Sequence, residues 1–386
     1  MRDKLVRVST VPLSLSLLLE GQLAFLNQYC DVTGVSSHGK ELDFVRERER
    51  VNAEAINIKR NISLINDLKS LYRLYRYFRR EKPLIVHSIT PKAGLLSMMA
   101  AGLSGVPIRM HTFTGLVFPY RTGLLQKILI CTDKLLCRCA TNIYPEGEGV
   151  KKDLLKYKIT SKPLHVLANG SVNDIDSSFF NPALFSSEDR KRLRTRLSFK
   201  VSDFVFIYAG RLSSDKGINE LVKAFTEINN TYRYTRLLLV GAMEPELDPL
   251  NTDTIDVINK HEHIISTGWQ TDVRPYYAIS DALVFPSFRE GFPNVVMQAG
   301  AMNIPSIVTD ISGCNEIIIE GENGTIIPSR DYRSLRDKME QFITCKKLVL
   351  KLKSKTTDMI KTRYEQDVVW RALLDEYRKL ESTLAG

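Results

Sequence analysis

The stretch Phe204-Val-Phe-Ile-Tyr-Ala-Gly-Arg-Leu-Ser-Ser-Asp-Lys-Gly217 is typical of a buried strand followed by a tight turn and the start of a helix. The apolar run predicts a strand over 204–209, and Gly210 permits the sharp turn after it. A helix beginning there presents unpaired backbone N–H groups to an anion, and Arg211 and Lys216 add two cations. We predict a diphosphate-binding turn in an α/β domain; exposed loop charges are the plainer interpretation. The spacing differs from that of a Walker A loop.

Short apolar runs alternate with helical stretches along most of the chain, the pattern of parallel α/β layers. Strands are expected at 5–10, 32–36, 84–89, 108–112, 141–144, 164–167, 204–209, 236–240, 264–267, 282–285 and 306–309. Helices are expected notably at 61–80, 93–104 and 124–140. The fold class is therefore α/β, with two doubly wound Rossmann-like domains. Ligands of such sheets bind outside the carboxyl ends of the strands, so we expect the site in a cleft between facing domains.

The length of 386 residues suggests two domains, because a domain typically takes about 100–200 residues. The segment 169–200 carries Asn-Gly, Asn-Pro and a charged run, which predict a linker. We place the first domain at 1–170 and the second at 171–364, and expect a helix over about 365–386 to return to the first. Hydrophobic residues at 44% and charged residues at 25% exclude disorder, collagen and a disulfide scaffold.

The net charge of +10 lies wholly in the first half of the chain. Residues 1–180 hold 26 Lys and Arg against 16 Asp and Glu, whereas residues 181–386 hold 28 of each kind. The excess is densest in 59–82, where leucines and aromatics recur at helical spacing. Such a helix suits an anionic membrane surface, although it could also be a core-facing helix with a solvated basic back. The cations expected to face the membrane are Arg73, Arg76, Arg79 and Arg80.

Six scattered cysteines without zinc spacing indicate reduced thiols in the cytoplasm. No stretch approaches the about 20 apolar residues of a membrane span, so we expect a cytoplasmic or peripherally bound chain. Asp174-Ile-Asp176 has the form of a metal–diphosphate motif but follows no buried strand. Because Arg211 and Lys216 can neutralise a diphosphate, we expect no metal and no cofactor.

A second motif, Phe285-Pro-Ser-Phe-Arg-Glu-Gly-Phe-Pro-Asn-Val-Val-Met-Gln298, also follows a buried strand. Proline favours the first helical position, so we predict a helix from Pro293 and place Glu290 at the carboxyl edge of the sheet. A carboxylate there can accept hydrogen bonds from sugar hydroxyls, unless it is an ordinary solvated loop residue. The backbone N–H groups that could cap a phosphate belong to Phe292, Asn294 and Val295.

Two strand ends in the first half carry histidines, in His87-Ser-Ile-Thr-Pro-Lys-Ala-Gly94 and His111-Thr-Phe-Thr-Gly115. Thr90 and Lys92 lie where the helix after the first motif begins, a favourable place for an acceptor's anionic group. A histidine at a strand end often caps backbone groups, and for that reason we expect His87 to be structural.

The motifs together resemble one family. Gly-Arg-Leu-x3-Lys-Gly, Pro-Ser-x2-Glu-Gly-Phe, Thr-Asp-Ile-Ser-Gly-Cys-Asn-Glu (309–316) and Asn-Gly-x3-Pro (323–328) occur in that order. This series resembles the retaining nucleotide-sugar glycosyltransferases of family 4, which have the GT-B fold. The resemblance is strong over 200–330 and weaker before it. It implies transfer of a hexose or N-acetylhexosamine from a nucleotide-diphosphate sugar, and a UDP-sugar is the favoured donor. The acceptor would be a polyprenyl-diphosphate-linked glycan in capsule, exopolysaccharide or O-antigen synthesis.

The resemblance also implies roles for individual residues. Arg211 and Lys216 would hold the donor diphosphate, Glu290 and His111 would lie at the donor sugar, and the 292–295 turn would hold phosphate. Gly268, Trp269 and Gln270 would flank the nucleotide base. The first domain would be the acceptor and membrane side, at the inner face of the cell membrane, and the second the donor side.

The chain departs from the family pattern at two places. The family has Glu-x7-Glu, whereas Gln298 stands at the second glutamate, which binds the donor ribose. An amide can still accept a hydroxyl hydrogen bond, but more weakly than a charged group. The family's Gly-Gly loop after the first strand is replaced by the hydroxyl-rich segment 10–16.

Two other functions are compatible with parts of the sequence. A nucleotide-sugar epimerase shares the architecture but needs acid–base carboxylates, for which Glu290 alone is thin support. A nucleic-acid-binding protein would explain the isoelectric point of about 9.2, yet no nucleic-acid signature accompanies the charge, and we expect no nucleic-acid partner.

Overall fold

A computed structural model describes residues 2–59, 63–246 and 248–385. The chain forms two compact units, 1–174 with 366–386 and 175–365. It therefore passes from unit 1 to unit 2 at 174–175 and returns at 365–366. Within the described ranges, no helix is long and apolar enough to cross a membrane.

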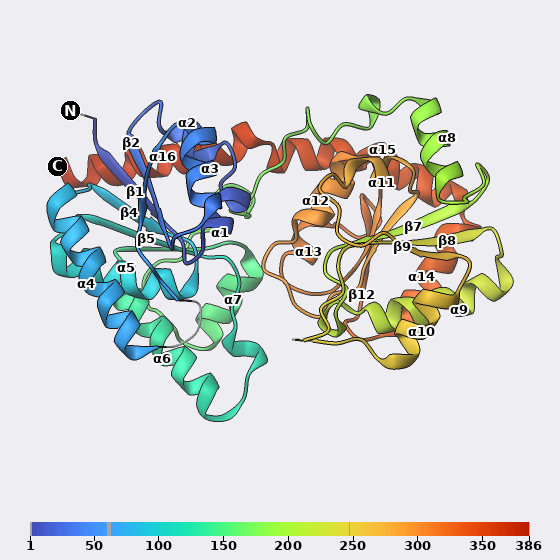
Figure 1. Ribbon diagram of the computed structural model, residues 1–386, viewed down its shortest axis with the longest axis horizontal. Coiled ribbons are helices and arrows are strands. Elements are labelled where there is room, and N and C mark those ends of the chain that lie inside the picture. The colour runs from blue at the N-terminus through green and yellow to red at the C-terminus, as the bar shows by residue number, and fades with distance from the viewer. Residues whose placement is uncertain (1, 60–62, 247, 386) are drawn as a thin grey trace. The chain divides into compact units, whose positions relative to one another are not determined.

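Unit 1 is a parallel sheet with a helical layer on each face (Figure 1). The strand order is β3-β2-β1-β4-β5-β6, with β1 (Lys4–Val8), β2 (Asp31–Ser36), β3 (Asn52–Ala55), β4 (Ile85–Ser88), β5 (Ile108–Phe113) and β6 (Asn142–Pro145). One face carries α4 (Leu64–Glu81), α5 (Pro91–Ser104) and α6 (Gly123–Cys139). The other carries α1 (Pro12–Leu18), α2 (Gln22–Leu26), α3 (Lys40–Glu49) and the returning α16 (Gln366–Ala385). The short η1 (Phe118–Tyr120) precedes α6, and α7 (Glu148–Lys156) follows β6.

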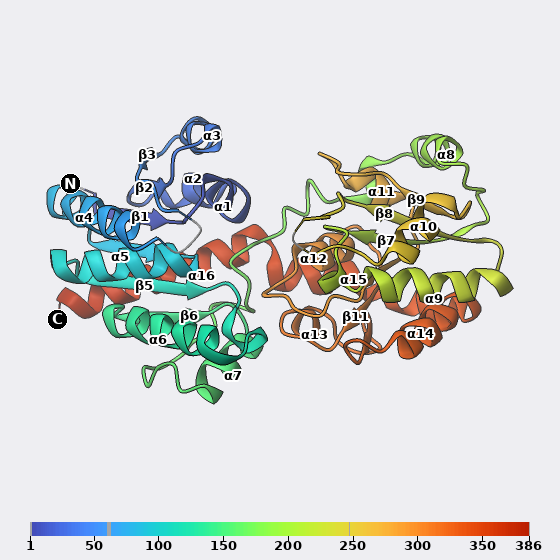
Figure 2. The same cartoon turned by 60° about the horizontal axis from the view of Figure 1, so that its bottom comes forward.

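Unit 2 repeats this plan. The strand order is β12-β11-β10-β7-β8-β9, with β7 (Phe204–Ala209), β8 (Thr235–Val240), β9 (Ile264–Ser266), β10 (Ala282–Phe285), β11 (Ser306–Thr309) and β12 (Gly324–Ile327). Helices α9 (Ile218–Thr231), α10 (Thr252–Lys260) and α14 (Tyr332–Thr344) cover one face, with α9 beside α14 in Figure 2. The opposite face carries α8 (Ser187–Arg196), α11 (Arg274–Ala278), α12 (Asn294–Ala301) and α15 (Lys346–Tyr364). The remaining short helices are η2 (Pro182–Leu184), η3 (Ser214–Lys216) and α13 (Cys314–Ile317).

The apolar runs form strands because helices cover both faces of these sheets. Every residue of β8 and β10 is buried, so these strands are continuously apolar instead of alternating. The expected α/β class with two doubly wound sheets is confirmed.

One expected strand is absent, and two observed strands were not predicted. The segment 164–167 forms only an isolated bridge to Ile143, because the chain turns away at Ala168, whose φ is 49°. β3 was not predicted, since Asn-Ala-Glu-Ala is not strand-like and this edge strand pairs with β2 alone. β12 was also missed.

The expected linker over 169–200 is wrong beyond the crossing point at 174–175. Ser186 and Asp189 form a capping box that starts α8, and Leu193 and Phe199 are buried in the core of unit 2. The serines and charges that suggested a linker are the cap and the solvated face of this helix.

Returning helix α16 belongs to the core of unit 1. Trp370 lies against Phe25, with ring centroids 5.4 Å apart, and its Nε1 donates to Asp174. The other carboxylate of the Asp174–Asp176 pair accepts from the backbone N–H groups of Ser178 and Phe179. Both carboxylates therefore have structural hydrogen bonds.

Candidate active site

The first motif builds the turn between β7 and α9 at the carboxyl edge of the sheet. Gly210 has φ of 138°, and Gly217, which precedes α9, has φ of 71°. A Cβ at Gly217 would lie 2.2 Å from the carbonyl oxygen of Pro286. Glycine is thus required both for the left-handed backbone and for the close approach of the β10–α12 loop.

Two ion pairs and one backbone bond hold these two loops together. Lys216 Nζ lies 2.5 Å from Glu290 Oε1, and Arg289 Nη2 lies 2.8 Å from Asp215 Oδ2. The backbone N–H of Phe288 donates to the carbonyl of Asp215 at 2.9 Å. Because β7 and β10 are neighbours in the sheet, motifs about 75 residues apart in sequence become one cluster.

The Lys216–Glu290 pair is largely shielded from water, with side-chain exposures of 13% and 16%. Burial raises the pKa of the neighbouring Tyr208 well above its ordinary value, and the charge of Glu290 adds to this effect. Burial alone would raise the pKa of Asp215. The hydrogen bond from Ser213 and the charge of Lys216 nevertheless hold it below its ordinary value. The turn therefore concentrates charges of both signs at low solvent exposure.

The third motif completes this edge of the sheet, and the fourth fixes a neighbouring helix. Thr309 Oγ1 donates to the carbonyl of Ser287, and a Cβ at Gly313 would lie 2.2 Å from the carbonyl oxygen of Gly291. In the fourth motif, Asn323 Nδ2 donates to the carbonyl of Ile317 at 3.0 Å, which fixes the end of α13. The first three motifs thus meet at the carboxyl edge of the sheet in unit 2, whereas Asn323 precedes β12 and lies at the opposite edge.

The start of α12 differs slightly from expectation. The helix begins at Asn294, and Pro293 is its N-cap instead of its first residue. Phe292 is buried, and the centroid of its ring lies 5.5 Å from the ring centroid of Tyr364. The buried Asn294 Oδ1 has no partner among the described residues, and Gln298 is half-buried about one turn into the helix.

Other donor-side residues lie apart from the Lys216–Glu290 pair. Arg211 is half-exposed and pairs with Glu244, so its charge is not directed at the pair. Trp269, after β9, is 71% exposed, and the neighbouring Gln270 donates to the carbonyl of Thr267 at 2.8 Å. The predicted roles of Arg211, Trp269 and Gln270 stay predictions.

In unit 1, hydrogen bonds join the turn after β1 to the turn after β4. Thr90, the N-cap of α5, accepts from the backbone N–H of Thr10 at 2.9 Å, and their hydroxyl oxygens lie 2.8 Å apart. Lys92 Nζ lies 2.7 Å from Asp67 Oδ1 on α4. An acceptor anion at Thr90 and Lys92 would have to compete with these contacts, and this role stays a prediction.

His111 is only 1% exposed and lies beneath α5. Its Nδ1 is 2.8 Å from Ser88 Oγ, and burial lowers its pKa to about 3, so the ring is neutral. A Cβ at Gly94 would lie 2.5 Å from His111 Cε1. The expected contact between His111 and the donor sugar stays a prediction that this burial does not support.

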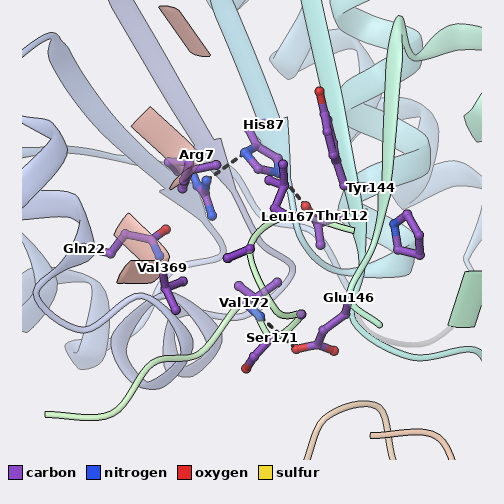
Figure 3. A pocket seen from close by; sticks show the side chains of 14 residues that line it. Arg7, Gln22, His87, Thr112, Tyr144, Glu146, Leu167, Ser171, Val172 and Val369 are labelled. Atoms are coloured by element: carbon purple, nitrogen blue, oxygen red, sulfur yellow. Dashed lines mark hydrogen bonds between the residues drawn. The ribbon is translucent and has the colours of Figure 1, made fainter. Parts of the chain in front are cut away.

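A buried polar network beside a small cavity was not predicted from the sequence (Figure 3). Arg7 Nη1 lies 2.7 Å from His87 Nδ1 and 2.6 Å from the hydroxyl of Tyr377 on α16. His87 Nε2 lies 2.8 Å from Thr112 Oγ1, in keeping with the structural role expected for His87. The cavity of about 30 Å³ lies next to Glu146, which accepts from the backbone N–H of Val172. Arg7 gave no sequence signal because it lies within the run Lys-Leu-Val-Arg-Val.

Comparison with known proteins finds a matching family model for each of the two units. Residues 189–359 match the family model of the glycosyl transferases group 1, and residues 17–146 match the model of glycosyl transferase 4-like domains. The capsular polysaccharide biosynthesis glycosyltransferase CapM of Staphylococcus aureus is 31% identical, over 97% of both chains. The UDP-Gal:alpha-D-GlcNAc-diphosphoundecaprenol alpha-1,3-galactosyltransferase of Escherichia coli is 29% identical, over 71% of this chain and 70% of that one.

Solved structures show the same fold. A glycosyltransferase from Rickettsia africae superposes with a TM-score of 0.81 at 18% identity over 98% of both chains. Anabaena Alr3699/HepE, in complex with UDP and glucose, has a TM-score of 0.81 at 15% identity over 98% of this chain and 100% of that one. The two family models and the 31% identical relative make the chain a glycosyltransferase, and its two parallel sheets are those of the GT-B class. The chain belongs to glycosyltransferase family 4.

Proposed function

We propose that this glycosyltransferase moves a hexose or N-acetylhexosamine from a UDP-sugar to a polyprenyl-diphosphate-linked glycan, with retention of the anomeric configuration. The transfer would serve capsule, exopolysaccharide or O-antigen assembly. The name of the Escherichia coli relative supports this proposal, since it gives a UDP-sugar donor and a diphosphoundecaprenol acceptor. A Campylobacter jejuni relative, 21% identical over 81% of both chains, is also named for a diphospho-undecaprenol acceptor.

The observation that carries the proposal is the Lys216–Glu290 pair at the junction of two motif loops. A bound donor offers a diphosphate to the lysine and sugar hydroxyls to the carboxylate, so one shielded pair matches two adjoining groups of the ligand. Lys216 stabilises the charge that develops on the departing diphosphate, and backbone N–H groups at the start of α12 can add to this effect. Arg211 reaches the diphosphate by exchanging its contact with Glu244. We nominate no covalent nucleophile.

The proposed reaction needs no metal ion. The cations of the turn supply the positive charge, and the one Asp-x-Asp sequence uses its carboxylates for structural hydrogen bonds. Initial rates in EDTA should equal those in added Mg²⁺ or Mn²⁺. Strict dependence on either ion would overturn this part of the proposal.

Helix α4 supports docking at the cytoplasmic face of an anionic membrane. Arg73, Arg76, Arg79 and Arg80 are all exposed. Three of them line, with Lys69 and Tyr72, a surface groove of about 620 Å³ against β3. Each cation near an anionic surface contributes about 1 kcal/mol. Reversal of Arg73 and Arg76 to Glu should lower sedimentation with anionic vesicles, and unchanged sedimentation would refute the docking role.

A donor screen tests the proposed activity. Melting curves with UDP-, GDP- and ADP-sugars should show a stabilising shift for UDP-sugars, because a ligand of the native state raises the melting temperature. The best donor is then incubated with a lipid-linked acceptor. Interconversion of the donor sugar without acceptor would instead favour an epimerase, and no shift with any donor would count against the proposal.

A further inference from the structure

Helix α6 leaves much of its apolar surface uncovered. Leu124 is 74% exposed, and Leu125 and Ile128 are exposed on the same first turns. Only Leu136 and Cys137, near its C-terminal end, are buried among the described residues of this helix. A core-facing helix normally buries its apolar stripe, and uncovered apolar patches mark interaction surfaces.

The charges around this apolar surface are mostly positive. The exposed cations are Arg121, Lys127, Lys134 and Arg138. Among the described residues, none of these four forms an ion pair with a carboxylate. The one acid of the helix is Asp133, and burial raises its pKa to about 7, so it is largely protonated below neutral pH. Cations beside leucine and isoleucine are the composition of a helix that lies in an anionic interface.

The fold places α6 on the same layer as α4. Helix α5 packs between them, and all three cover one face of the sheet (Figure 1). Because each follows a parallel strand, their N-terminal ends lie at the carboxyl edge of that sheet. The start of α4 also exposes Leu64, Ile65 and Leu68. Two apolar helix starts and two basic helix bodies thus share one side of unit 1.

We propose that the first turns of α6 insert Leu124, Leu125 and Ile128 into the acyl layer of an anionic bilayer. The helix would be a second membrane-contacting element. Its contact with the membrane would be apolar, whereas that of α4 is mainly electrostatic. This inference rests on the proposed docking of unit 1 but not on the proposed sugar transfer. A bilayer is the occupant that matches an apolar strip edged by unpaired cations, whereas a second copy of this chain would bring the same positive charge.

Vesicle partitioning of the full chain separates the two elements. The variant Leu124→Ser/Leu125→Ser/Ile128→Ser should bind phosphatidylglycerol-containing vesicles at least tenfold more weakly than the unaltered chain. The matched control is Leu13→Ser/Leu17→Ser, whose leucines are similarly exposed on α1, on the opposite face of the same sheet. It should bind within twofold of the unaltered chain. Binding that survives 1 M NaCl should be lost in the α6 variant, because salt screens charge but not apolar contact.

Insertion depth gives a second readout. Brominated lipids should quench the tryptophan of Leu124→Trp but not that of Leu17→Trp. Unchanged partitioning of the α6 variant, or loss of a dimer in sedimentation without loss of vesicle binding, would overturn the inference. Melting curves and UDP binding confirm that each variant is folded. A chain that transfers no sugar but still loses vesicle binding in the α6 variant would contradict the proposed activity and support the α6 contact.

Discussion

The Lys216–Glu290 pair allows a prediction that separates stability from catalysis. At 2.5 Å and an effective dielectric of about 20, the Coulomb attraction is about 7 kcal/mol before desolvation is subtracted. Desolvation costs several kcal/mol per ion, so the net contribution of the intact pair is small. Lys216→Met, however, leaves a shielded carboxylate without its cation, which we expect to cost about 2–3 kcal/mol.

For a domain of this size, that loss corresponds to a fall in melting temperature of about 4–12 °C. The same variant removes the cation that stabilises the departing diphosphate, so kcat/KM should fall about 10²–10³-fold. The double variant Lys216→Met/Glu290→Gln removes both charges and should recover most of the melting temperature without recovering activity. Measurements are calorimetric melting curves and initial rates of UDP release with acceptor present.

A matched lysine provides the control. Lys260 pairs with Asp256 at 3.0 Å on the surface of α10, where both side chains are largely exposed. Because exposed pairs contribute little, Lys260→Met should change the melting temperature by about 1–2 °C or less and leave activity unchanged. Lys216→Met with near-normal activity but a lowered melting temperature would refute the reasoning and leave the pair a structural link between loops.

Three further predictions concern single positions. Gly217→Ala should lower both stability and activity, because its Cβ would meet the Pro286 carbonyl, and melting curves with donor titration check this. Burial depresses the pKa of His111 to about 3. The neutral buried ring therefore contributes its full stability above about pH 6.5, and this contribution falls as the pH drops from there toward 3. Urea midpoints at pH 7 and 4.5 should differ less in His111→Gln than in the unaltered chain; an equal difference would contradict this. Gln298→Glu should tighten donor binding about threefold to tenfold by calorimetry, because a charged acceptor binds hydroxyls more strongly; unchanged affinity would place Gln298 away from the ribose.

Local patterns predicted much of unit 2. Strand, glycine turn and helix start are neighbours in sequence, so the β7–α9 and β10–α12 turns could be located from residues alone. The sequence could not show that Lys216 reaches Glu290 instead of remaining free, since that contact depends on strand order. It also could not show that Arg211 is engaged by Glu244.

Unit 1 was less predictable. A strand-end histidine looks the same in sequence whether it faces solvent or a helix, and only the packing of Gly94 shows that His111 is covered. The contact of Arg7 with Tyr377 joins residues 370 positions apart, beyond the reach of any periodicity. The exposed leucines of α6 were expected in a helix, but a pattern of apolar residues does not tell which face the core leaves uncovered.

The most direct test of the central claim follows the sugar itself. A labelled UDP-sugar, chosen from the melting screen, is incubated with the chain and a polyprenyl-diphosphate-linked glycan, and UDP and labelled lipid are quantified together. We predict equal amounts of UDP and labelled lipid-linked product, with both lost in Lys216→Met. UDP release without labelled lipid, or label transfer that survives Lys216→Met undiminished, would contradict the account.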